Sequence, residues 1–436
     1  MIVNVIGGGL AGCEASWQIA SYGIEVNLYE MKPKKFTPAH HYKNLCELVC
    51  SNSLKASRVE SSAGLLKAEM ERLGSLIVPC AKETSVEAGG ALAVDREKFS
   101  DLVTSKIKSN PLINVIEQEV TEIPTDEYTI IATGPLTSDS LAKSIQEVCG
   151  DYLSFYDAAS PIVTFDSLDK NLVFSASRYD RGEADYINCP MNKEEYLEFY
   201  NALIDAETVQ LKDFETVAFK VYEGCMPIEV LAKRGEDTMR FGPLKPVGLK
   251  DPRTDKRPYA VVQLRKENRE GTLYNLVGFQ TNLKFGEQKR VFSKITGLQN
   301  AEFIRYGVMH RNSFIDSPRL LNKDFSLKKN PKIYFAGQMT GVEGYIESAM
   351  SGIIAGHSLA RTLLDKPQIE LSKYTMCGAM CNYISDEFIS DFQPMGCNMG
   401  ILPELPTRIK DKKLKYAEYS KRALNSLEET LKSIDF

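Results

Sequence analysis

The first thirty residues constrain the fold more strongly than any other part of the chain. A short apolar run at residues 2–6 leads into the glycine-rich segment 7–12, and a helical stretch follows that ends at Gly23. A second apolar run then closes with Glu30, 18 positions after the last glycine of the segment. This is the G-x-G-x-x-G pattern inside a strand–turn–helix–strand unit. It predicts an α/β domain of the Rossmann type that binds a dinucleotide.

Each position in this pattern has a physical role. Gly7 allows the tight turn, Gly9 lets the backbone approach a pyrophosphate, and Gly12 permits close packing of the helix on the strand. The N-terminal end of the helix offers free N–H groups to phosphate, and Glu30 can accept hydrogen bonds from ribose hydroxyls. The predicted cofactor-binding residues of this unit are Gly7, Gly8, Gly9, Leu10, Ala11, Gly12 and Glu30.

Two later segments fit the same domain. Residues 128–135 and 333–338 both have the pattern of a buried strand that runs into a glycine turn, and a helix of small residues follows the second at 345–363. Both segments resemble the FAD domain of glutathione-reductase-like flavoproteins. The resemblance implies FAD rather than NAD, because an NAD domain has no need of the late segment. It adds the cofactor-binding candidates Gly134, Gly337, Gln338, Gly341, Gly344 and Tyr345.

The composition and the pattern of the sequence change between the two parts of this domain. Aromatic and polar residues there mix with short alternating strands, at 260–264 and 272–279, and with turn-rich stretches. We therefore predict an α/β fold in which a glutathione-reductase-like Rossmann FAD-binding domain is interrupted by an α+β insertion domain. The expected bounds are 1–149 for the first part of the FAD domain, 150–325 for the insertion on the RNA and folate side, and 326–436 for the second part with its basic C-terminal tail.

Composition excludes several classes of protein. The chain has no run of about 18 apolar residues, so we expect no membrane span. It begins without the basic region of a signal peptide, and its ten cysteines form no C-x-x-C pair, so we expect a reduced, cytoplasmic protein. Only four histidines are present, and we predict no metal site.

Two cysteines stand in unusual settings. Cys50 lies in the polar stretch 47–53, and Cys225 lies in a constrained turn between a glycine and a nearby proline. Thiolates add readily to electron-poor carbons, so each cysteine is a candidate catalytic residue. The alternative for each is a small buried apolar residue.

The histidines offer weaker candidates for substrate contacts. His40 and His41 are adjacent in a short loop, where one of them can face a ligand or both can be solvated. His310 begins a polar cluster with Arg311 and Asn312 near the end of the predicted insertion. These five residues are retained as candidate substrate contacts.

Charge is unevenly distributed along the chain. The net charge of −5 argues against a nucleic-acid partner. However, residues 233–265 hold nine basic and four acidic side chains, and residues 408–422 hold seven and two. The second stretch is interleaved with Tyr416 and Tyr419, which suits phosphate contacts and base stacking, although solvated faces are the simpler interpretation.

The ordered motifs resemble one flavoprotein family over nearly the entire chain. The sequence is similar to the bacterial folate- and FAD-dependent tRNA (uracil-5-)-methyltransferases. The GidA-type tRNA-modifying flavoproteins share the FAD domain but carry a long C-terminal helical domain, which we do not expect in this protein. The motifs that carry the resemblance are residues 7–12, 37–41, 47–53, 89–96, 156–159, 223–227, 307–312 and 335–345.

The resemblance implies a reaction and its participants. A cysteine thiolate adds to C6 of a T-loop uridine in tRNA, and C5 then receives the one-carbon unit of 5,10-methylenetetrahydrofolate by way of FAD, with NAD(P)H as the reductant. Cys225 is expected to be the nucleophile and Cys50 the flavin-side acid or base, because Cys50 follows the FAD-binding unit closely. We expect no obligate protein partner.

Three alternatives stay open from the sequence. The same chemistry can act on a uridine of 23S rRNA. A non-methylating RNA-binding flavoprotein could serve as one half of a complex. A plain NAD(P)H-dependent flavin oxidoreductase would need neither the motif cysteines nor the basic stretches.

Overall fold

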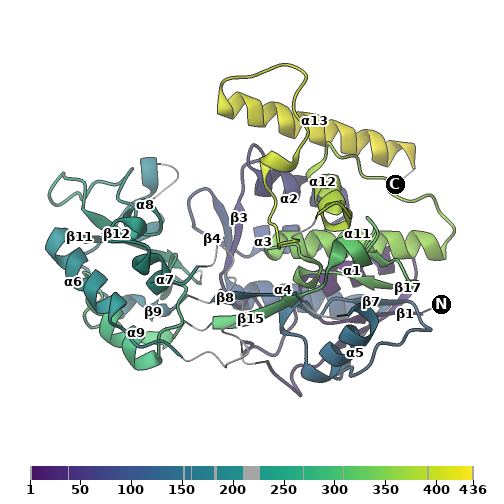
Figure 1. Ribbon diagram of the computed structural model, residues 1–436, viewed down its shortest axis with the longest axis horizontal. Coiled ribbons are helices and arrows are strands. Elements are labelled where there is room, and N and C mark those ends of the chain that lie inside the picture. Colours follow the sequence, from purple (N-terminus) through teal and green to yellow (C-terminus); the bar gives the residue numbers. More distant parts are fainter. Residues whose placement is uncertain are drawn as a thin grey trace.

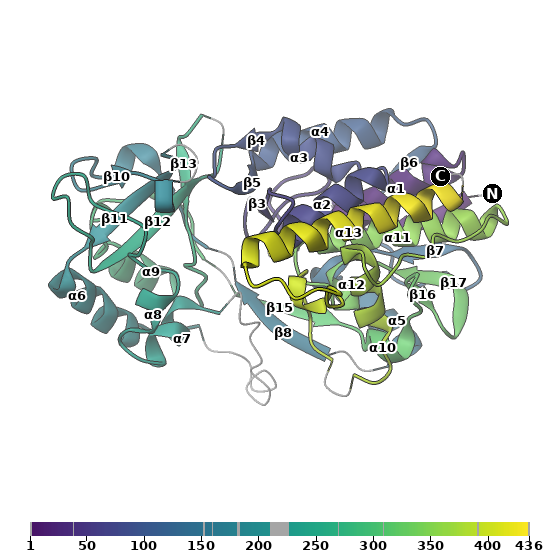
Figure 2. The same cartoon turned by 90° about the horizontal axis from the view of Figure 1, so that it is seen from above.

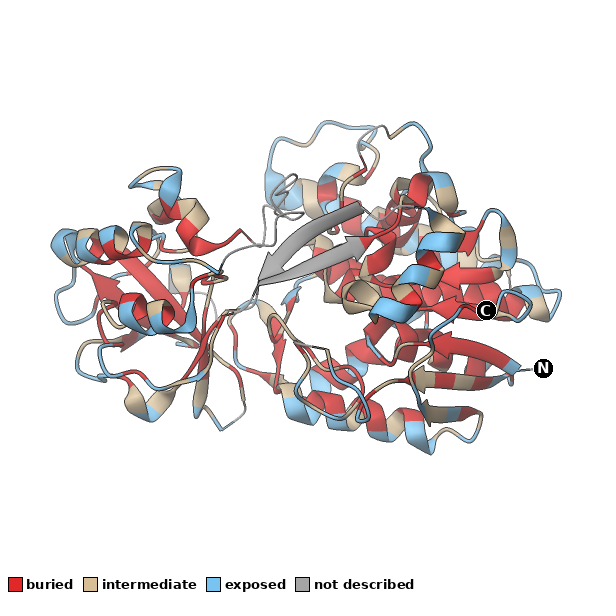
Figure 3. Ribbon diagram, turned by 60° about the horizontal axis from the view of Figure 1, so that its bottom comes forward, coloured by how far each residue is buried: buried red, intermediate tan, exposed pale blue. Residues whose placement is uncertain are grey.

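The computed structural model describes residues 2–37, 39–150, 153–158, 160–180, 184–209, 226–268, 270–307, 309–389 and 392–434. Figure 1 shows two bodies side by side, a larger one built around both chain ends and a smaller one formed by the middle of the chain. Each body has its own cluster of buried apolar side chains, and Figure 3 shows these as two separate buried interiors.

A six-stranded sheet forms the centre of the larger body. Its strand order is β16-β17-β7-β1-β2-β6, and every neighbouring pair is parallel except the short β16 with β17. Parallel strands joined by helices, with the first glycine turn after the central β1, define a Rossmann-type α/β fold, as the sequence predicted. The strands are β1 (Ile2–Ile6), β2 (Glu25–Glu30), β6 (Ile113–Glu117), β7 (Thr129–Ile131), β16 (Ser326–Leu327) and β17 (Asn330–Phe335).

Two helices with small residues pack closely over this sheet. They are α1 (Leu10–Ser21) and α11 (Tyr345–Leu363), which lie side by side in Figure 1. A side chain at Gly352 would place its Cβ 2.1 Å from the carbonyl oxygen of Ala11. Glycine at this position therefore permits the two backbones to approach.

A small antiparallel sheet lies at the edge of the larger body that faces the smaller one, and three helices extend from it over the larger body (Figure 2). The sheet has the order β3-β5-β4. Its elements and the helices around it are β3 (Ser53–Ala56), β4 (Ser85–Val86), β5 (Ala91–Val94), α2 (Ser62–Arg72), α3 (Ile77–Glu83) and α4 (Arg96–Ser109).

The smaller body is built on an antiparallel sheet of order β10-β11-β12-β13-β9-β14. Helices α6 and α9 bury Phe199 and Phe292 against Phe279, which gives this body its own aromatic core. The elements are β9 (Ile162–Thr164), β10 (Phe174–Ser175), β11 (Tyr186–Met191), β12 (Ala260–Lys266), β13 (Leu273–Leu276), β14 (Phe303–Arg305), α6 (Lys193–Ile204), α7 (Ile228–Lys233), α8 (Thr238–Phe241) and α9 (Phe285–Phe292).

An antiparallel pair of strands joins the two bodies. It consists of β8 (Leu153–Ala158) and β15 (Met309–Phe314), and it lies between the two bodies in Figure 1. The chain thus leaves the larger body shortly after residue 150 and returns before residue 326. The domain bounds given by the sequence stay predictions.

The C-terminal part of the chain covers the larger body. Figure 1 shows α13 (Lys412–Ser433) as the outermost layer, above α2 and α12 (Met376–Ser385). Tyr419, Ala423 and Leu427 of α13 are buried, while its other faces meet solvent.

Among the described residues, no helix has both the length and the apolar character that a membrane span requires. The remaining helices are α5 (Asp139–Cys149), α10 (Ser317–Leu320) and the short 3-10 turns at Gly134–Leu136, Phe165–Ser167, Arg178–Asp180, Gln338–Thr340 and Met399–Ile401.

Candidate cofactor site and the cysteine beside it

The glycine turn after β1 is shaped by contacts that exclude side chains. Gly7 has a φ of +106°, and a Cβ there would lie 2.6 Å from the carbonyl oxygen of Ala132. A Cβ at Gly12 would lie 1.8 Å from the carbonyl oxygen of Gly7. Around Gly9, by contrast, no described heavy atom lies within 4 Å of the Cβ position. Gly7 and Gly12 are thus required by packing, whereas Gly9 faces open space.

The first turn of α1 is left open toward that space. Gly9 is its N-cap residue, and no described side chain caps the helix. The first N–H groups of a helix have no partner within the helix, and together with the helix dipole they attract anions. This end of α1 can therefore hold a pyrophosphate.

Glu30, at the end of β2, stabilises the glycine turn by hydrogen bonds. One carboxylate oxygen accepts a hydrogen bond from the Gly8 N–H at 2.9 Å, and the other accepts one from the Lys32 N–H at 2.9 Å. Each carboxylate oxygen can accept a second hydrogen bond. Glu30 is thus both part of the turn and available to a ribose hydroxyl beside it.

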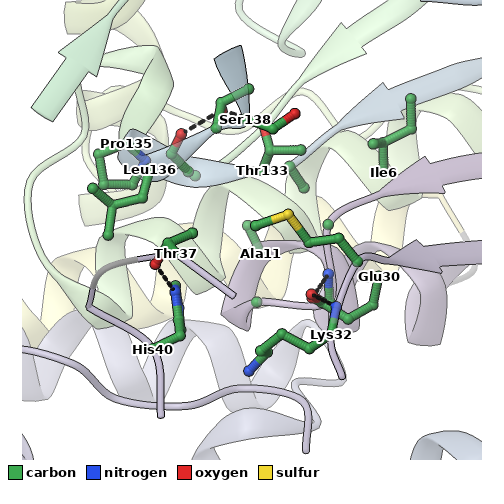
Figure 4. A pocket seen from close by; sticks show the side chains of 18 of the residues that line it. Ile6, Ala11, Glu30, Lys32, Thr37, His40, Thr133, Pro135, Leu136 and Ser138 are labelled. Atoms are coloured by element: carbon green, nitrogen blue, oxygen red, sulfur yellow. Dashed lines mark hydrogen bonds between the residues drawn. The ribbon is translucent and has the colours of Figure 1, made fainter. Parts of the chain in front are cut away.

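A hollow runs along these elements. Figure 4 shows Glu30, Ala11 and Thr133 around it, with Thr37 and His40 on the loop after β2. Ten of the predicted cofactor residues and one histidine border the hollow, namely Gly7, Gly8, Gly9, Leu10, Ala11, Glu30, Gly134, Gly337, Gln338, Tyr345 and His40. It therefore reaches from the end of β2 to the first residue of α11.

Three predicted cofactor residues are not on its border. The Cβ position of Gly12 points at the carbonyl oxygen of Gly7 rather than at the hollow. Gly341 has a φ of +82°, and a Cβ there would lie 2.4 Å from the Phe392 ring. Gly344 has a φ of +121°, and its Cβ would lie 2.3 Å from the Glu347 carboxylate. Backbone conformation and packing account for glycine at these positions.

Lys32 borders the hollow and was not identified from the sequence. Its ammonium group is almost completely buried and donates to the carbonyl oxygens of Tyr42 at 3.1 Å and Asn44 at 2.8 Å. It also pairs with Glu47 at 3.3 Å. These contacts hold the loop that carries His40 and His41. His40 contacts the Thr37 hydroxyl through Nδ1 at 2.6 Å. His41 donates its backbone N–H to Glu47 at 2.8 Å.

Tyr345, which borders the hollow at the α11 end, contacts Cys50, which is not on that border. The Tyr345 hydroxyl oxygen accepts hydrogen bonds from the backbone N–H of Cys50 at 2.9 Å and of Ser51 at 3.2 Å, and it lies 3.0 Å from the Cys50 Sγ. A phenol oxygen has two lone pairs and one proton. Because the two N–H groups take the lone pairs, the proton is directed at the sulfur. Burial raises the pKa of Tyr345 well above its ordinary value, which keeps that proton in place.

Two guanidinium groups hold the backbone that precedes this thiol. Arg96 donates to the Leu48 carbonyl oxygen at 2.6 Å, and Arg305 donates to the Val49 carbonyl oxygen at 2.6 Å. Both arginines interact electrostatically with Cys50. Nearby positive charge and a hydrogen-bond donor both favour the thiolate over the thiol.

A third arginine ties the next residues to the smaller body. Arg265 of β12 donates to the Asn52 side-chain oxygen at 3.1 Å and to the Ser51 hydroxyl at 2.8 Å. Arg305 belongs to β14 of the same sheet. The segment that carries Cys50 is therefore held from both bodies, by residues that are far from it in the sequence.

The contacts around Cys50 include none of the other predicted catalytic and substrate residues. Cys225 lies outside the described residues. His310, Arg311 and Asn312 belong to β15, and their side chains are likewise outside the described part. Cys377 and Cys381 are buried in α12, and burial raises the pKa of Cys381 to about 12, which makes its thiol a poor nucleophile.

The chain is similar in sequence to known proteins over almost its whole length. The family model described as glucose inhibited division protein A matches residues 2–367. The methylenetetrahydrofolate--tRNA-(uracil-5-)-methyltransferase TrmFO of Acetivibrio thermocellus is 59% identical over 98% of each chain. The proteins of the same name from Lactobacillus johnsonii and Bacillus pumilus are 57% and 56% identical, over 98% and 99% of this chain and 97% and 99% of their own.

A solved structure shares the architecture. Aquifex aeolicus GidA superimposes with a TM-score of 0.70 at 14% identity, over 98% of this chain and 73% of that one. At this identity the likeness concerns the fold alone.

Proposed function

Since the chain belongs to the glucose inhibited division protein A family, and within it to the methylenetetrahydrofolate–tRNA-(uracil-5-)-methyltransferases, we propose that it methylates C5 of a T-loop uridine in tRNA. The carbon donor is 5,10-methylenetetrahydrofolate, the cofactor is FAD, and the reductant is NAD(P)H. One structural observation carries the proposal. The hollow that begins at the dinucleotide-type glycine turn reaches Tyr345, whose hydroxyl contacts the Cys50 thiol at 3.0 Å.

The residues on the hollow fit FAD. The uncapped start of α1 and the open space at Gly9 suit the pyrophosphate, and Glu30 suits the ribose. Gly337, with a φ of +86°, and the N-terminal end of α11 suit the flavin end of the molecule. When bound, FAD supplies redox chemistry and transfer of the one-carbon unit, which no protein side chain can supply.

The chain's own residues supply nucleophile and proton chemistry. We assign the addition to uracil C6 to Cys225, as a thiolate adds to an electron-poor carbon and makes C5 nucleophilic. Cys50 is assigned to acid–base work, since the Tyr345 hydroxyl contacts its sulfur and the two guanidinium groups interact with it electrostatically. Among the substrate candidates, His40 borders the hollow. His41, His310, Arg311 and Asn312 stay predictions.

Formation of 5-methyluridine tests the proposal. The purified protein is incubated with tRNA that lacks the T-loop methyl group, with methylenetetrahydrofolate and NADPH, and the nucleosides are separated and identified by mass. We expect 5-methyluridine in tRNA and none in 23S rRNA assayed in parallel. Product in the rRNA alone would contradict the substrate assignment.

A trapping experiment tests the roles of the two cysteines. RNA that contains 5-fluorouridine forms a covalent adduct with a nucleophile at C6. We expect Cys225→Ala to abolish the adduct and Cys50→Ala to retain it. The reverse result would exchange the two roles.

A further inference from the structure

The N-terminal end of α13 carries two lysines that form no ion pair with a described carboxylate. Asp411 caps the helix by accepting the Leu414 N–H at 2.8 Å. Lys412 and Lys413 follow in the first turn and are exposed, and neither has an ion-pair partner among the described residues. Some other surface lysines are paired, for example Lys35 with Glu119 at 2.7 Å. This cationic end is therefore available to a partner.

The two lysines border a hollow together with Arg58. The hollow, which we name the Arg58 hollow, holds three cationic side chains against one carboxylate, and its border consists of Arg58, Glu60, Lys412, Lys413 and Tyr416. The Lys412 ammonium lies 5.5 Å from the centre of the Tyr416 ring. Cations gathered around a hollow suit the phosphates of a nucleic acid.

A second hollow continues from the same arginine toward the smaller body. Arg58 borders it as well, and on its other side lie Arg178, Tyr179 and Tyr186. Figure 2 shows that α13 points its N-terminal end toward the smaller body and its C-terminal end away from it. The two hollows share Arg58, and we refer to them together as the strip.

This strip lies within reach of Cys50 along a single strand. Cys50 precedes β3, and Arg58 follows it. Eight residues, even if fully extended, span about 27 Å, which is less than one turn of a nucleic-acid duplex. The stem of an RNA whose loop lies at Cys50 can therefore bring its phosphates to the strip.

We propose that the N-terminal end of α13 and Arg58 bind the phosphate backbone of the substrate tRNA outside the nucleotide that is modified. The inference rests on the proposed function, since it takes tRNA as the substrate. It assigns to α13 a part in holding the RNA stem, whereas uridine chemistry belongs to the cysteines.

Charge reversal at the helix end tests this assignment. Lys412→Glu with Lys413→Glu is compared with a control that reverses two exposed lysines elsewhere, Lys143→Glu with Lys289→Glu. Both double variants change the net charge equally. Glutamate in the first turn of a helix interacts favourably with the dipole, so we expect the α13 variant to fold. Flavin content and the thermal midpoint check that both variants do.

We expect the α13 variant to bind tRNA at least fivefold more weakly than wild type at 0.1 M salt. Its plot of log affinity against log salt should be less steep by about 1 to 2, because each lost phosphate contact removes about 0.9 from the slope. Arg58→Glu should act in the same direction. The control should bind as wild type.

Two outcomes overturn the inference while the function stands. One is unchanged affinity and salt slope of the α13 variant, and the other is an equal loss in the control, which would trace the effect to net charge. A wild-type protein that neither binds nor methylates tRNA would instead contradict the proposed function, and the inference with it.

Discussion

Gly9 and Gly12 belong to one turn but have opposite requirements. A Cβ at Gly9 would meet no described atom within 4 Å, whereas a Cβ at Gly12 would lie 1.8 Å from the Gly7 carbonyl oxygen. Gly9 also has an extended backbone, with φ −77°, that any residue adopts. Packing accounts for glycine at position 12, and we attribute glycine at position 9 to the proposed cofactor.

Alanine substitutions separate these two reasons. We expect Gly9→Ala to leave the apoprotein within about 0.5 kcal/mol of wild-type stability and to weaken FAD binding at least tenfold. Gly12→Ala should lower stability by about 1–3 kcal/mol, because the helix must move away from the strand. Flavin titration and urea unfolding measure the two effects. Undiminished FAD affinity in the Gly9 variant would contradict the placement of the pyrophosphate.

The Tyr345 hydroxyl is the second residue-scale feature. Tyr345→Phe removes the group that donates to the Cys50 sulfur and accepts two backbone N–H groups. We expect alkylation of Cys50 by iodoacetamide at pH 8, followed by mass spectrometry of its peptide, to slow severalfold. Tyr383→Phe, which removes a hydroxyl bonded to the Gln393 carbonyl oxygen, is the matched control. An unchanged rate in Tyr345→Phe would show that the hydroxyl does not act on the thiol.

At the scale of elements, much of the larger body could be predicted from local pattern. The predicted helix 345–363 coincides with α11, and the predicted strands at 128–135 and 333–338 contain or overlap β7 and β17. The sequence predicts a first helix that follows the glycine-rich segment 7–12, but the helix begins within that segment, at Leu10. Gly9 is the N-cap, and its carbonyl accepts the Cys13 N–H at 2.9 Å. The spacing of apolar residues and the glycines at the ends are enough to predict an element when it is long and both of its ends are marked.

The surroundings of Cys50 could not be predicted in this way. Arg265 and Asn52 are 213 positions apart, and Cys50 and Tyr345 are 295 apart. Each partner lies on a different element, and no local period links an arginine on one strand with a carbonyl on a distant loop. The cysteine was found through its polar neighbours in sequence, but the groups that act on it emerge only when the elements pack.

A buried carboxylate at the start of α12 gives an element-scale prediction. Glu69 accepts the N–H groups of Met376 and Cys377 at 2.8 Å each, and burial raises its pKa to about 7. A carboxyl whose pKa is higher when folded binds its proton more tightly in the native state. Stability from this group is therefore present at acidic pH and is lost as the pH rises from about 4.5 to about 7.

Glu69→Gln, which keeps the shape without the charge, isolates this effect. From pH 5 to pH 8 the wild type should lose about 1–3 kcal/mol relative to the variant. Thermal midpoints at both pH values measure the difference, with the exposed Glu428→Gln as control. Parallel pH profiles of wild type and Glu69→Gln would contradict the assignment.

At the scale of the whole molecule, the two bodies meet around the segment that carries Cys50. Arg265 and Arg305 reach it from the sheet of the smaller body, and Arg96 reaches it from α4 of the larger one. A change in how the bodies meet is therefore expected to alter the chemistry at Cys50 before it alters cofactor binding.

Arg265→Lys tests this coupling, since lysine keeps the charge but loses the fork that contacts both Ser51 and Asn52. We expect methylation to slow at least tenfold while flavin content stays at the wild-type level. Arg257→Lys on an exposed loop of the same body is the control and should be neutral. Equal loss of flavin and activity would show that the arginine supports the fold rather than the site.

Transfer of labelled carbon shows directly whether methylenetetrahydrofolate is the carbon donor. The protein is given tRNA, NADPH, methylenetetrahydrofolate labelled with ¹³C in its methylene group, and unlabelled S-adenosylmethionine. The account predicts that the 5-methyluridine formed is heavier by one mass unit in nearly every molecule. Unlabelled 5-methyluridine, with its methyl group taken from S-adenosylmethionine, would contradict it.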